Sequence, residues 1–210
     1  MKDETIIISL GGSLIIPDDI DVDFLKDFKK LILSQVEKGK KFVIITGGGK
    51  ICRNYNNAAE KITSVDKEDL DWLGIAATRL NAELLRVSFG DFAFEKIIMD
   101  PDMMPKTSKP IILGGGWKPG NSSDLAAIHC AISVNAKKII NLSNTDYVYG
   151  SDPKTNPNAK RFEKISWPEY RKLIPKDWNP GLNSPFDPIA SKMAEKEGIE
   201  VIIMNGKPIN

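Results

Sequence analysis

Short apolar runs alternate with longer amphipathic stretches along the chain. Runs rich in isoleucine and valine are typical of strands buried on both faces of a parallel sheet. They occur at 5–10, 42–46, 111–113, 138–142 and 200–204, with a weaker run at 97–99. Apolar residues at spacings of three and four predict helices over 22–38, 50–62, 66–87, 125–134, 167–174 and 187–197. This alternation predicts the α/β class, with no second domain boundary.

Two of the predicted helices carry apolar stripes that we expect to face the core. In 50–62 the stripe comprises Ile51, Tyr55, Ala58, Ala59 and Ile62, and in 66–87 it comprises Leu70, Leu73, Ala77, Leu80, Leu84 and Val87. The polar stretch 141–162 has no such period, and we expect it to carry a hairpin around 147–149 and to form a ligand-binding lobe.

Three predicted strands end in glycine, in IIISLGGS (6–13), FVIITGGGKICRNY (42–55) and PIILGGGWKPGNSS (110–123). Parallel strands bring their carboxyl ends to one edge, where open α/β sheets bind ligands. A glycine turn that leads into a helix presents backbone N–H groups to an anion. One glycine exit alone is more often a plain turn, but three along one edge predict two phosphorylated molecules that face each other. The chain has neither a Walker A motif nor a GxGxxG after the first strand. The two commonest explanations for glycine loops in an α/β protein, a P-loop and a Rossmann dinucleotide site, are therefore excluded.

Composition narrows the class of protein further. The 210 residues are 41% hydrophobic and 27% charged, with a formal net charge of +1, and so predict one globular domain without the basic excess of nucleic-acid or anionic-membrane binders. No apolar run approaches the ~20 residues of a membrane span. Cys52 and Cys130 are far apart, which predicts two small buried residues and a cytoplasmic protein. The single histidine, His129, excludes a histidine-rich metal site and is expected to be a packed helix residue.

The candidate chemistry lies in one arginine and two aspartates. Arg53 follows Gly49 by one helical turn, so its guanidinium can fork onto a phosphate held by the glycine amides, although a solvated surface arginine fits the spacing equally well. Asp124 and Asp187 each lie at the start of a predicted helix, where N-terminal capping explains either residue alone. They become candidates for the site only if both point into the same cleft. Phosphoryl transfer to another phosphate needs no general base, because the acceptor oxygen is largely anionic at pH 7. It needs positioning, Mg²⁺ and positive charge.

SLGGS, ITGGGKICRNY, DWLGIAATRLNA, GGWKPGNSSD, NTDYVYGSDPKTNP and FDPIASKMAEKEGI occur in the order of the amino acid kinase family. Among its members, the chain most resembles the uridylate kinases of the archaeal type. The resemblance implies a three-layer αβα sandwich around a mainly parallel sheet, formed by residues 1–210 as one domain. It implies Mg²⁺-dependent transfer of the ATP γ-phosphoryl group to UMP in pyrimidine nucleotide synthesis. It also implies a cytoplasmic homo-oligomer, a hexamer built as a trimer of dimers, with neither nucleic acid nor membrane as partner.

The resemblance also implies roles for individual residues, with an acceptor-binding part at about 1–135 and an ATP-binding part at about 136–210. The residues implied in ATP binding are Ser9, Leu10, Gly11, Gly12, Ser13, Gly49, Arg53, Ser143, Asn144, Tyr149 and Asp152. Those implied in UMP binding are Gly48, Asp71, Gly116, Trp117, Lys118, Pro119, Gly120, Asn121, Ser122 and Ser123. Arg53, Asp124, Asp187 and Lys192 are implied in catalysis, and no side chain is expected to be a dedicated metal ligand.

Two positions depart from the family pattern. Ser9 stands where most members have a lysine that reaches the transferred phosphate, so Lys192 or Lys50 is a candidate to replace that charge. Tyr147 stands where a glycine is common. Two alternatives therefore remain open: a kinase for another small phosphate or carboxylate, and a nucleotide- or oxyanion-binding member that has lost catalysis. Ser9 favours the second alternative, whereas the retained Arg53 and Asp71 argue against it.

Overall fold

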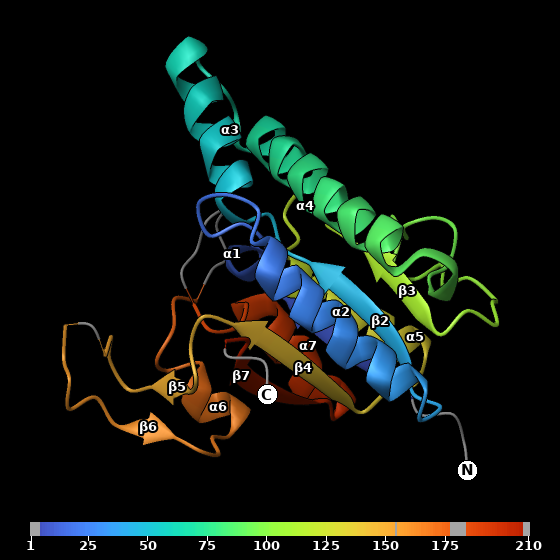
Figure 1. Cartoon of the computed structure of the whole chain (residues 1–210). Coiled ribbons are helices and arrows are strands. Elements are labelled where there is room, and N and C mark those ends of the chain that lie inside the picture. Colours follow the sequence, from blue (N-terminus) through green and yellow to red (C-terminus); the bar gives the residue numbers. More distant parts are fainter. Residues whose placement is uncertain (1–4, 154, 177–183, 208–210) are drawn as a thin grey trace.

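The computed structural model describes residues 5–153, 155–176 and 184–207. Within these residues a parallel five-stranded sheet has the order β3–β2–β1–β4–β7, and two short strands, β5 and β6, pair antiparallel beside it (Figure 1). The strands are β1 Thr5–Leu10, β2 Lys41–Thr46, β3 Ile111–Gly114, β4 Lys138–Ser143, β5 Val148–Tyr149, β6 Arg161–Phe162 and β7 Glu200–Asn205. The helices are α1 Gly12–Ile15, α2 Val22–Val36, α3 Gly49–Ile62, α4 Lys67–Phe89, α5 Ser123–Ser133, α6 Trp167–Tyr170 and α7 Pro188–Glu197, with a 3-10 turn at Gly90–Phe92.

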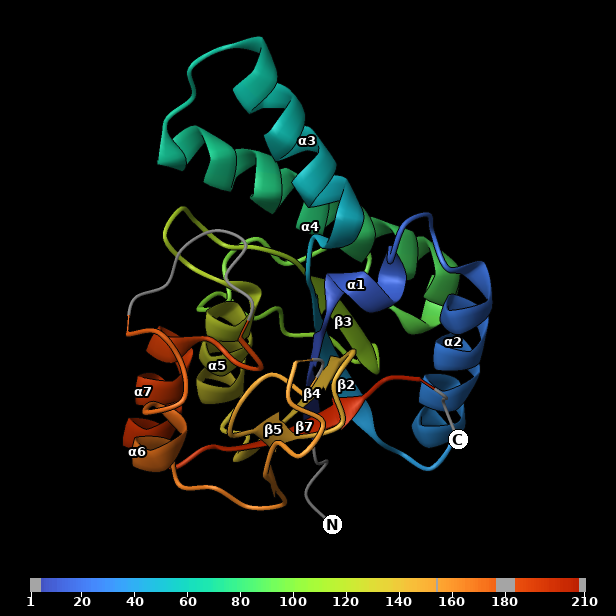
Figure 2. The same ribbon diagram turned by 90° about the vertical axis from the view of Figure 1, so that its left-hand side faces the viewer.

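Helices cover the large sheet on both faces, so the predicted three-layer αβα sandwich is confirmed (Figure 2). Successive side chains of a strand point to opposite faces. In β1, Ile8 and Leu10 therefore pack with α1, α2 and α4, whereas Ile7 packs with α5 and α7. Ser9 shares the face of Ile7, which turns its hydroxyl toward the N-terminus of α5.

The carboxyl ends of the strands form a crevice, as the glycine exits predict. The chain starts at β1 and moves outward to β2 and β3 on one side, then crosses to β4 and β7 on the other, which makes β1 the switch point where α/β sheets bind ligands. Two of the glycine loops pack directly against each other there. A Cβ added to Gly12 would lie 2.1 Å from Gly49 N, and Gly49 itself has a φ of +65°. Only glycine permits this approach, so the first two loops form one anion-facing surface.

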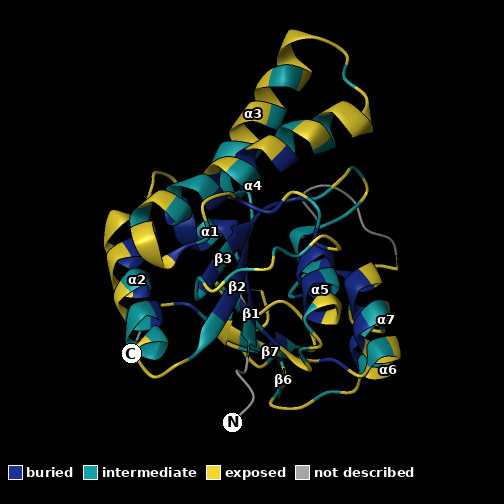
Figure 3. Cartoon of the chain, turned by 90° about the vertical axis from the view of Figure 1, so that its right-hand side faces the viewer, coloured by how far each residue is buried: buried dark blue, intermediate teal, exposed yellow. Residues whose placement is uncertain are grey.

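The helix pair α3 and α4 departs from the prediction. It projects past the edge of the sheet, and no residue of α3 is buried (Figures 1 and 3). The predicted inner stripe of α3 is correct only at its start, because Ile51 packs against the core, whereas Tyr55 is 60% and Ile62 is 82% exposed. The stripe predicted for α4 is partly correct: Ala77 is buried and Leu84 packs against the core, but Leu80 and Val87 are exposed. The buried face of α4 carries Ile75, Ala77, Thr78, Asn81, Ala82, Leu85 and Phe89.

Smaller differences concern the connections. The run 97–99 is not a strand, because only an isolated bridge joins Ile98 to Gly114. The connection after the first glycine pair contains the short helix α1, which the sequence did not indicate. The hairpin expected near 147–149 is confirmed by the pairing of β5 with β6. Part of the connection between the predicted helices 167–174 and 187–197 lies outside the described residues.

Candidate active site

A cavity of about 660 Å³ opens at the carboxyl edge of the sheet, within the range typical of small-molecule sites. Its walls come from the glycine loop before α3, the α3–α4 pair, the loop after β3 and the N-termini of α5 and α7. The lining residues are Gly48, Gly49, Cys52, Arg53, Asn56, Asn57, Glu60, Leu70, Asp71, Gly74, Ile75, Thr78, Gly116, Asn121, Ser122, Ser123, Asp124, Ser184 and Asp187. The cavity thus collects residues that are far apart in the sequence but were predicted to share one site.

Asp124 and Asp187 point into this same cavity and are connected to each other. The Asp187 backbone N–H donates to Asp124 Oδ2 at 3.1 Å, and the Ser9 hydroxyl donates to Asp124 Oδ1 at 2.8 Å. Asp187 Oδ1 caps α7 by accepting from Ala190 N at 2.6 Å. Capping therefore explains only part of the role of Asp187, and the condition that both carboxylates share a cleft is met.

Burial dominates the electrostatics of this pair. It raises the pKa of Asp124 to about 6, although the Ser9 hydroxyl favours the charged form. Burial also raises the pKa of Asp187, against the hydrogen bond from Ala190 N. The site therefore holds two carboxylates in an environment that disfavours their charge, an arrangement that is common at functional sites.

Two buried side-chain oxygens lack a hydrogen-bond partner among the described residues, Asn56 Oδ1 and Asp187 Oδ2. The Ser122 hydroxyl is close enough to the Asp187 carboxylate to lower its pKa, but it makes no hydrogen bond of ordinary geometry with Oδ2. Buried polar atoms in native proteins are nearly always satisfied by protein, water or ligand. Both oxygens belong to residues that line the same cavity, where water or a polar ligand can satisfy them.

Helix α4 holds the glycine loops in place through three polar residues that the sequence reasoning did not assign to the site. Asn81 Nδ2 donates to Gly47 O at 2.8 Å, and Thr78 Oγ1 accepts from Gly116 N at 2.6 Å. Arg79 donates to the carbonyls of residues 116 and 117 at 3.2 and 2.9 Å. Their partners lie more than 30 positions away in the sequence, so no local pattern marked these residues as part of the site. These three residues fix the loops that line the cavity.

The loop after β3 closes one side of the cavity through Asp71. Gly120 N donates to Asp71 Oδ2 at 2.7 Å, which places the carboxylate at the cavity wall. Of the predicted acceptor residues in this loop, Gly116, Asn121, Ser122 and Ser123 line the cavity. Trp117 instead packs on His129, which also hydrogen bonds to Asp102, and Lys118 lies over the Trp117 ring. Trp117, Lys118, Pro119 and Gly120 are thus not among the residues that line the cavity. His129 is a packed helix residue, as expected.

The residues implied in ATP binding lie along the same edge but mostly outside this cavity. Ser9 to Ser13 follow β1 into α1, and Gly11 N donates to Leu142 O at 2.7 Å, which joins that loop to the end of β4. Ser143 and Asn144 are at that end, and Tyr149 is in the β5–β6 pair, where its ring contacts Tyr147 edge-on. Asp152 follows β5. Only Gly49 and Arg53 of this set line the cavity.

Positive charge in the cavity comes from Arg53, the one basic residue among its described lining residues. Four acidic residues share that lining: Glu60, Asp71, Asp124 and Asp187. Lys192 is exposed on α7, and Lys50 lies 3.7 Å from Asp18, and neither lines the cavity. The structure therefore brings together Arg53, Asp124 and Asp187 from the predicted catalytic set, and leaves Lys192 apart.

The αβα fold and the cavity at the carboxyl edge of its sheet are those of a phosphotransferase. The chain belongs to the amino acid kinase family. The model described as "Amino acid kinase family" matches residues 4–205. The uridylate kinase of Pyrococcus abyssi is 33% identical over 205 residues, 96% of this chain and 90% of the relative. That of Methanospirillum hungatei is 34% identical over 206 residues, 97% and 86% of the two chains.

Solved structures agree with this assignment. The uridylate kinase of Archaeoglobus fulgidus superimposes with a TM-score of 0.81 at 30% identity and covers 98% of this chain and 92% of that chain. The UMP kinase of Bacillus anthracis, at 21% identity and a TM-score of 0.76, covers 98% and 88% and supports the fold alone. Among the described residues, no helix is long and apolar enough to cross a membrane.

Proposed function

We propose that this chain is a uridylate kinase, which transfers the γ-phosphoryl group of ATP to UMP and releases UDP and ADP. The observation that carries the proposal is the cavity that places Arg53, the glycine loop and Asp71 beside the Asp124–Asp187 pair. The similarity to uridylate kinases along nearly the whole chain supports the same acceptor. The volume of the cavity, about 660 Å³, is within the range of small-molecule sites and supports an acceptor of this kind.

In the proposed reaction the UMP phosphate lies at Gly48, Gly49 and Arg53. One of its anionic oxygens attacks the γ-phosphorus, the bond to the bridging β–γ oxygen breaks, and ADP leaves with that electron pair. No side chain has to remove a proton, because the second pKa of a phosphate monoester is about 6. The protein therefore contributes position and charge: Arg53 forks onto the phosphate oxygens, and Asp124 and Asp187 fix the junction between the two substrates.

We also propose Mg²⁺ as the metal that accompanies ATP. Among the described residues no group of three or more His, Cys, Asp or Glu side chains can hold a metal ion. The proposal rests on ATP itself, because Mg²⁺ is usually held by substrate phosphates and waters instead of an all-protein cage. When bound, the ion would neutralise the charge that develops on the phosphates. No side chain of this chain is assigned to it as a direct ligand.

For ATP we propose the edge formed by the ends of β1 and β4. The turn that comprises Ser9, Leu10, Gly11, Gly12 and Ser13 would lie against the ATP phosphates, and Ser143, Asn144, Tyr149 and Asp152 would hold adenosine. The direct contact between the loops of Gly12 and Gly49 supports this arrangement, because it brings the two phosphate-binding turns together. Residues 1–135 would then mainly bind the acceptor, and residues 136–210 ATP.

A homo-oligomer, with the hexamer as a trimer of dimers, belongs to the same proposal. The outer surface of α3 and α4 supports it, because Tyr55, Ile62, Leu80 and Val87 are large apolar residues exposed in the single chain. Light scattering that gives the mass of six chains is the expected result, and a monomer would contradict it. A cytoplasmic location and a place in pyrimidine nucleotide synthesis follow from the proposed substrates.

Steady-state ADP release across UMP, CMP, dUMP, AMP, GMP, acetylglutamate and isopentenyl phosphate tests the function. We expect UMP to give the highest kcat/KM, because the relatives that match nearly the whole chain are uridylate kinases. Asp71 suits the ribose hydroxyls of any ribonucleotide and repels an anionic amino acid. The comparison with dUMP isolates the 2′-hydroxyl from the base. Turnover with another acceptor alone would identify a different kinase. Nucleotide binding without turnover would favour the storage or regulatory alternative.

Asp71 is the residue whose substitution should separate the two substrates. Replacement by alanine removes the expected ribose acceptor and also the partner of Gly120 N. We expect the KM for UMP to rise about tenfold or more, as the loss of one or two hydrogen bonds to a charged group predicts, with the KM for ATP within about twofold. Asp71→Asn keeps an acceptor for Gly120 N and should have a smaller effect. Asp69→Ala, in the exposed first turn of the same helix, is the matched control. Equal changes in both KM values would refute the ribose assignment.

A further inference from the structure

Tyr170, the last residue of α6, is buried, with 1% of its surface exposed, and it does not line the cavity. Its hydroxyl contacts both backbone groups of a single residue. It donates to Phe186 O at 2.6 Å and accepts from Phe186 N at 2.7 Å. A phenol can do both at once, so the hydroxyl fixes the position and orientation of this stretch of backbone.

Phe186 immediately precedes the carboxylate pair. The next residue is Asp187, whose N–H donates to Asp124 Oδ2 and whose side chain caps α7. A continuous series of hydrogen bonds therefore runs from Tyr170 through the backbone of Phe186 and Asp187 to Asp124, and on to Ser9. Asp124 and Asp187 are the members of this series that line the cavity, and Tyr170 lies at the end of the series, behind Phe186.

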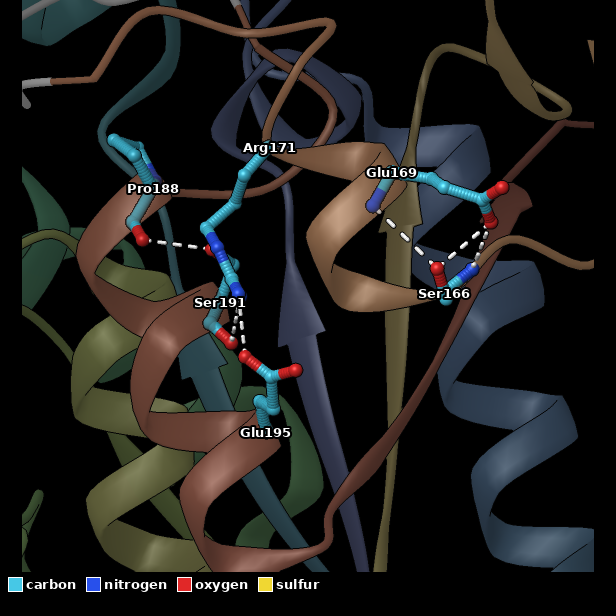
Figure 4. Close-up of polar contacts among 6 residues, drawn as sticks. All are labelled: Ser166, Glu169, Arg171, Pro188, Ser191 and Glu195. Atoms are coloured by element: carbon cyan, nitrogen blue, oxygen red, sulfur yellow. Dashed lines mark hydrogen bonds and ion pairs between the residues drawn. The ribbon is translucent and has the colours of Figure 1, made fainter.

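The surroundings of Tyr170 hold it rigidly. The Trp167 ring lies 5.9 Å from the rings of both Tyr170 and Phe186. Helix α6 begins with a capping box, in which Ser166 and Glu169 bond reciprocally (Figure 4). Arg171, which follows α6, donates to Ser191 O at 3.4 Å and pairs with Glu195, so it ties α6 to α7 (Figure 4). These contacts hold α6 against α7 and so fix the position of the Tyr170 hydroxyl.

We propose that Tyr170 is a positioning residue for phosphoryl transfer, which sets the place of Asp187 and, through its amide, of the Asp124 carboxylate. Without the hydroxyl, the Phe186 N–H loses the partner that the structure shows for it, whereas the C=O keeps the Ser184 hydroxyl at 3.1 Å. A buried N–H without a partner is costly, so the segment is expected to shift until the N–H is satisfied. A shift on the order of 1 Å far from the chemistry can lower a rate by about 10²-fold. The kinetic consequence rests on the proposed kinase function, whereas the structural one does not.

Tyr170→Phe tests the proposal, because the ring keeps its packing against Trp167 while only the hydroxyl is lost. We expect kcat to fall about tenfold or more, with the KM values for UMP and ATP within about twofold, because Arg53 and Asp71 are untouched. Hydrogen exchange at the Phe186 and Asp187 amides should accelerate in the same variant. The matched control is Ser166→Ala, which removes the α6 capping box but leaves both bonds to Phe186. It should lower thermal stability, with kcat and exchange at these amides unchanged.

The two measurements separate failure of this proposal from failure of the proposed function. If the wild-type protein does not phosphorylate UMP, the function is refuted, and exchange alone decides whether Tyr170 holds the Asp187 segment. Wild-type kcat and wild-type exchange in Tyr170→Phe would overturn the positioning role. An equal loss of kcat in Ser166→Ala would also overturn it, because that result would assign the effect to α6 stability in general.

Discussion

Replacement of Arg53 by alanine is expected to lower kcat for UMP phosphorylation by on the order of 10²-fold or more, as the loss of a preorganised charge at a transferring phosphoryl group predicts. Arg53 is the one basic residue among the described residues that line the cavity, and four acidic residues share that lining. No other described cation in the wall is placed to compensate. Two anionic substrates would then meet in a site that is itself negative, and the transition state would lose its clamp.

The controls distinguish charge from geometry. Arg53→Lys keeps the charge but lacks the planar fork, so it should restore only part of the rate. Lys61→Ala removes a cation from the last turn of the same helix, away from the cavity, and should leave kcat unchanged. The measurement is kcat under saturating ATP and UMP at pH 7.5 for all four proteins. A loss below about threefold in Arg53→Ala would return Arg53 to the role of a solvated surface residue.

The strands and their glycine exits were predictable because local chemistry determines them. Buried parallel strands are apolar on both faces, so runs such as 42–46 can be recognised without knowledge of their partners. The glycines are needed where two backbones touch, because a Cβ added to Gly12 would lie 2.1 Å from Gly49 N. The sequence therefore predicts parallel strands that end in glycine at one edge of the sheet. Because ligands of α/β proteins bind at that edge, it also predicts where the site lies.

The faces of α3 and α4 were not predictable in the same way. Periodicity identifies an apolar stripe, but it does not say whether another element of the same chain covers it. Tyr55 and Ile62 keep the helical spacing and are nevertheless exposed. On α4 the polar Thr78 and Asn81 are buried because the glycine loops supply their partners. Those contacts join residues more than 30 positions apart, so a local pattern could not reveal them.

The role of Ser9 also required the fold. In the sequence, Ser9 stands where most members of the family have a lysine, so the chain lacks a positive charge at this position. In the structure its hydroxyl donates to Asp124, which helps this buried carboxylate to ionise. Lys50 and Lys192, the candidates for the missing charge, do not line the cavity. The position of Ser9 therefore supports the acidic pair, and Arg53 is left as the cation of the acceptor side.

Asp124→Asn is expected to abolish most of the activity and at the same time to stabilise the fold. The pKa of Asp124 is raised by burial from 3.8 to about 6, so keeping this carboxylate charged at pH 7.5 costs up to about 3 kcal/mol, at 1.36 kcal/mol per pKa unit. The amide has no charge to bury. Its oxygen can accept from Asp187 N and its NH₂ can donate to Ser9 Oγ, so both hydrogen bonds of the wild type have a counterpart.

The pH dependence gives the sign of the effect. Below about pH 4, Asp124 is protonated in both the folded and the unfolded chain, and wild type and variant should be equally affected. Between about pH 4 and pH 6 the unfolded chain releases the proton first, so this group lowers wild-type stability as the pH rises. Above about pH 6, Asp124 is ionised in both states, and the difference in stability between wild type and the variant no longer changes with pH. The variant should therefore gain in Tm relative to wild type from pH 4 to 6, by up to several degrees for a chain of this size.

Thermal unfolding from pH 4 to 8, with kcat measured at pH 7.5, checks both halves of this expectation. Asp23→Asn, at an exposed carboxylate in the first turn of α2, should change neither Tm nor kcat appreciably and is the matched control. Equal Tm values for Asp124→Asn and wild type at pH 7.5 would show that the carboxylate is not held charged at a cost. Retained kcat would show that its charge is dispensable. A more stable but inactive variant would mean that the charged Asp124 carboxylate lowers the stability of the fold and is nevertheless required for phosphoryl transfer.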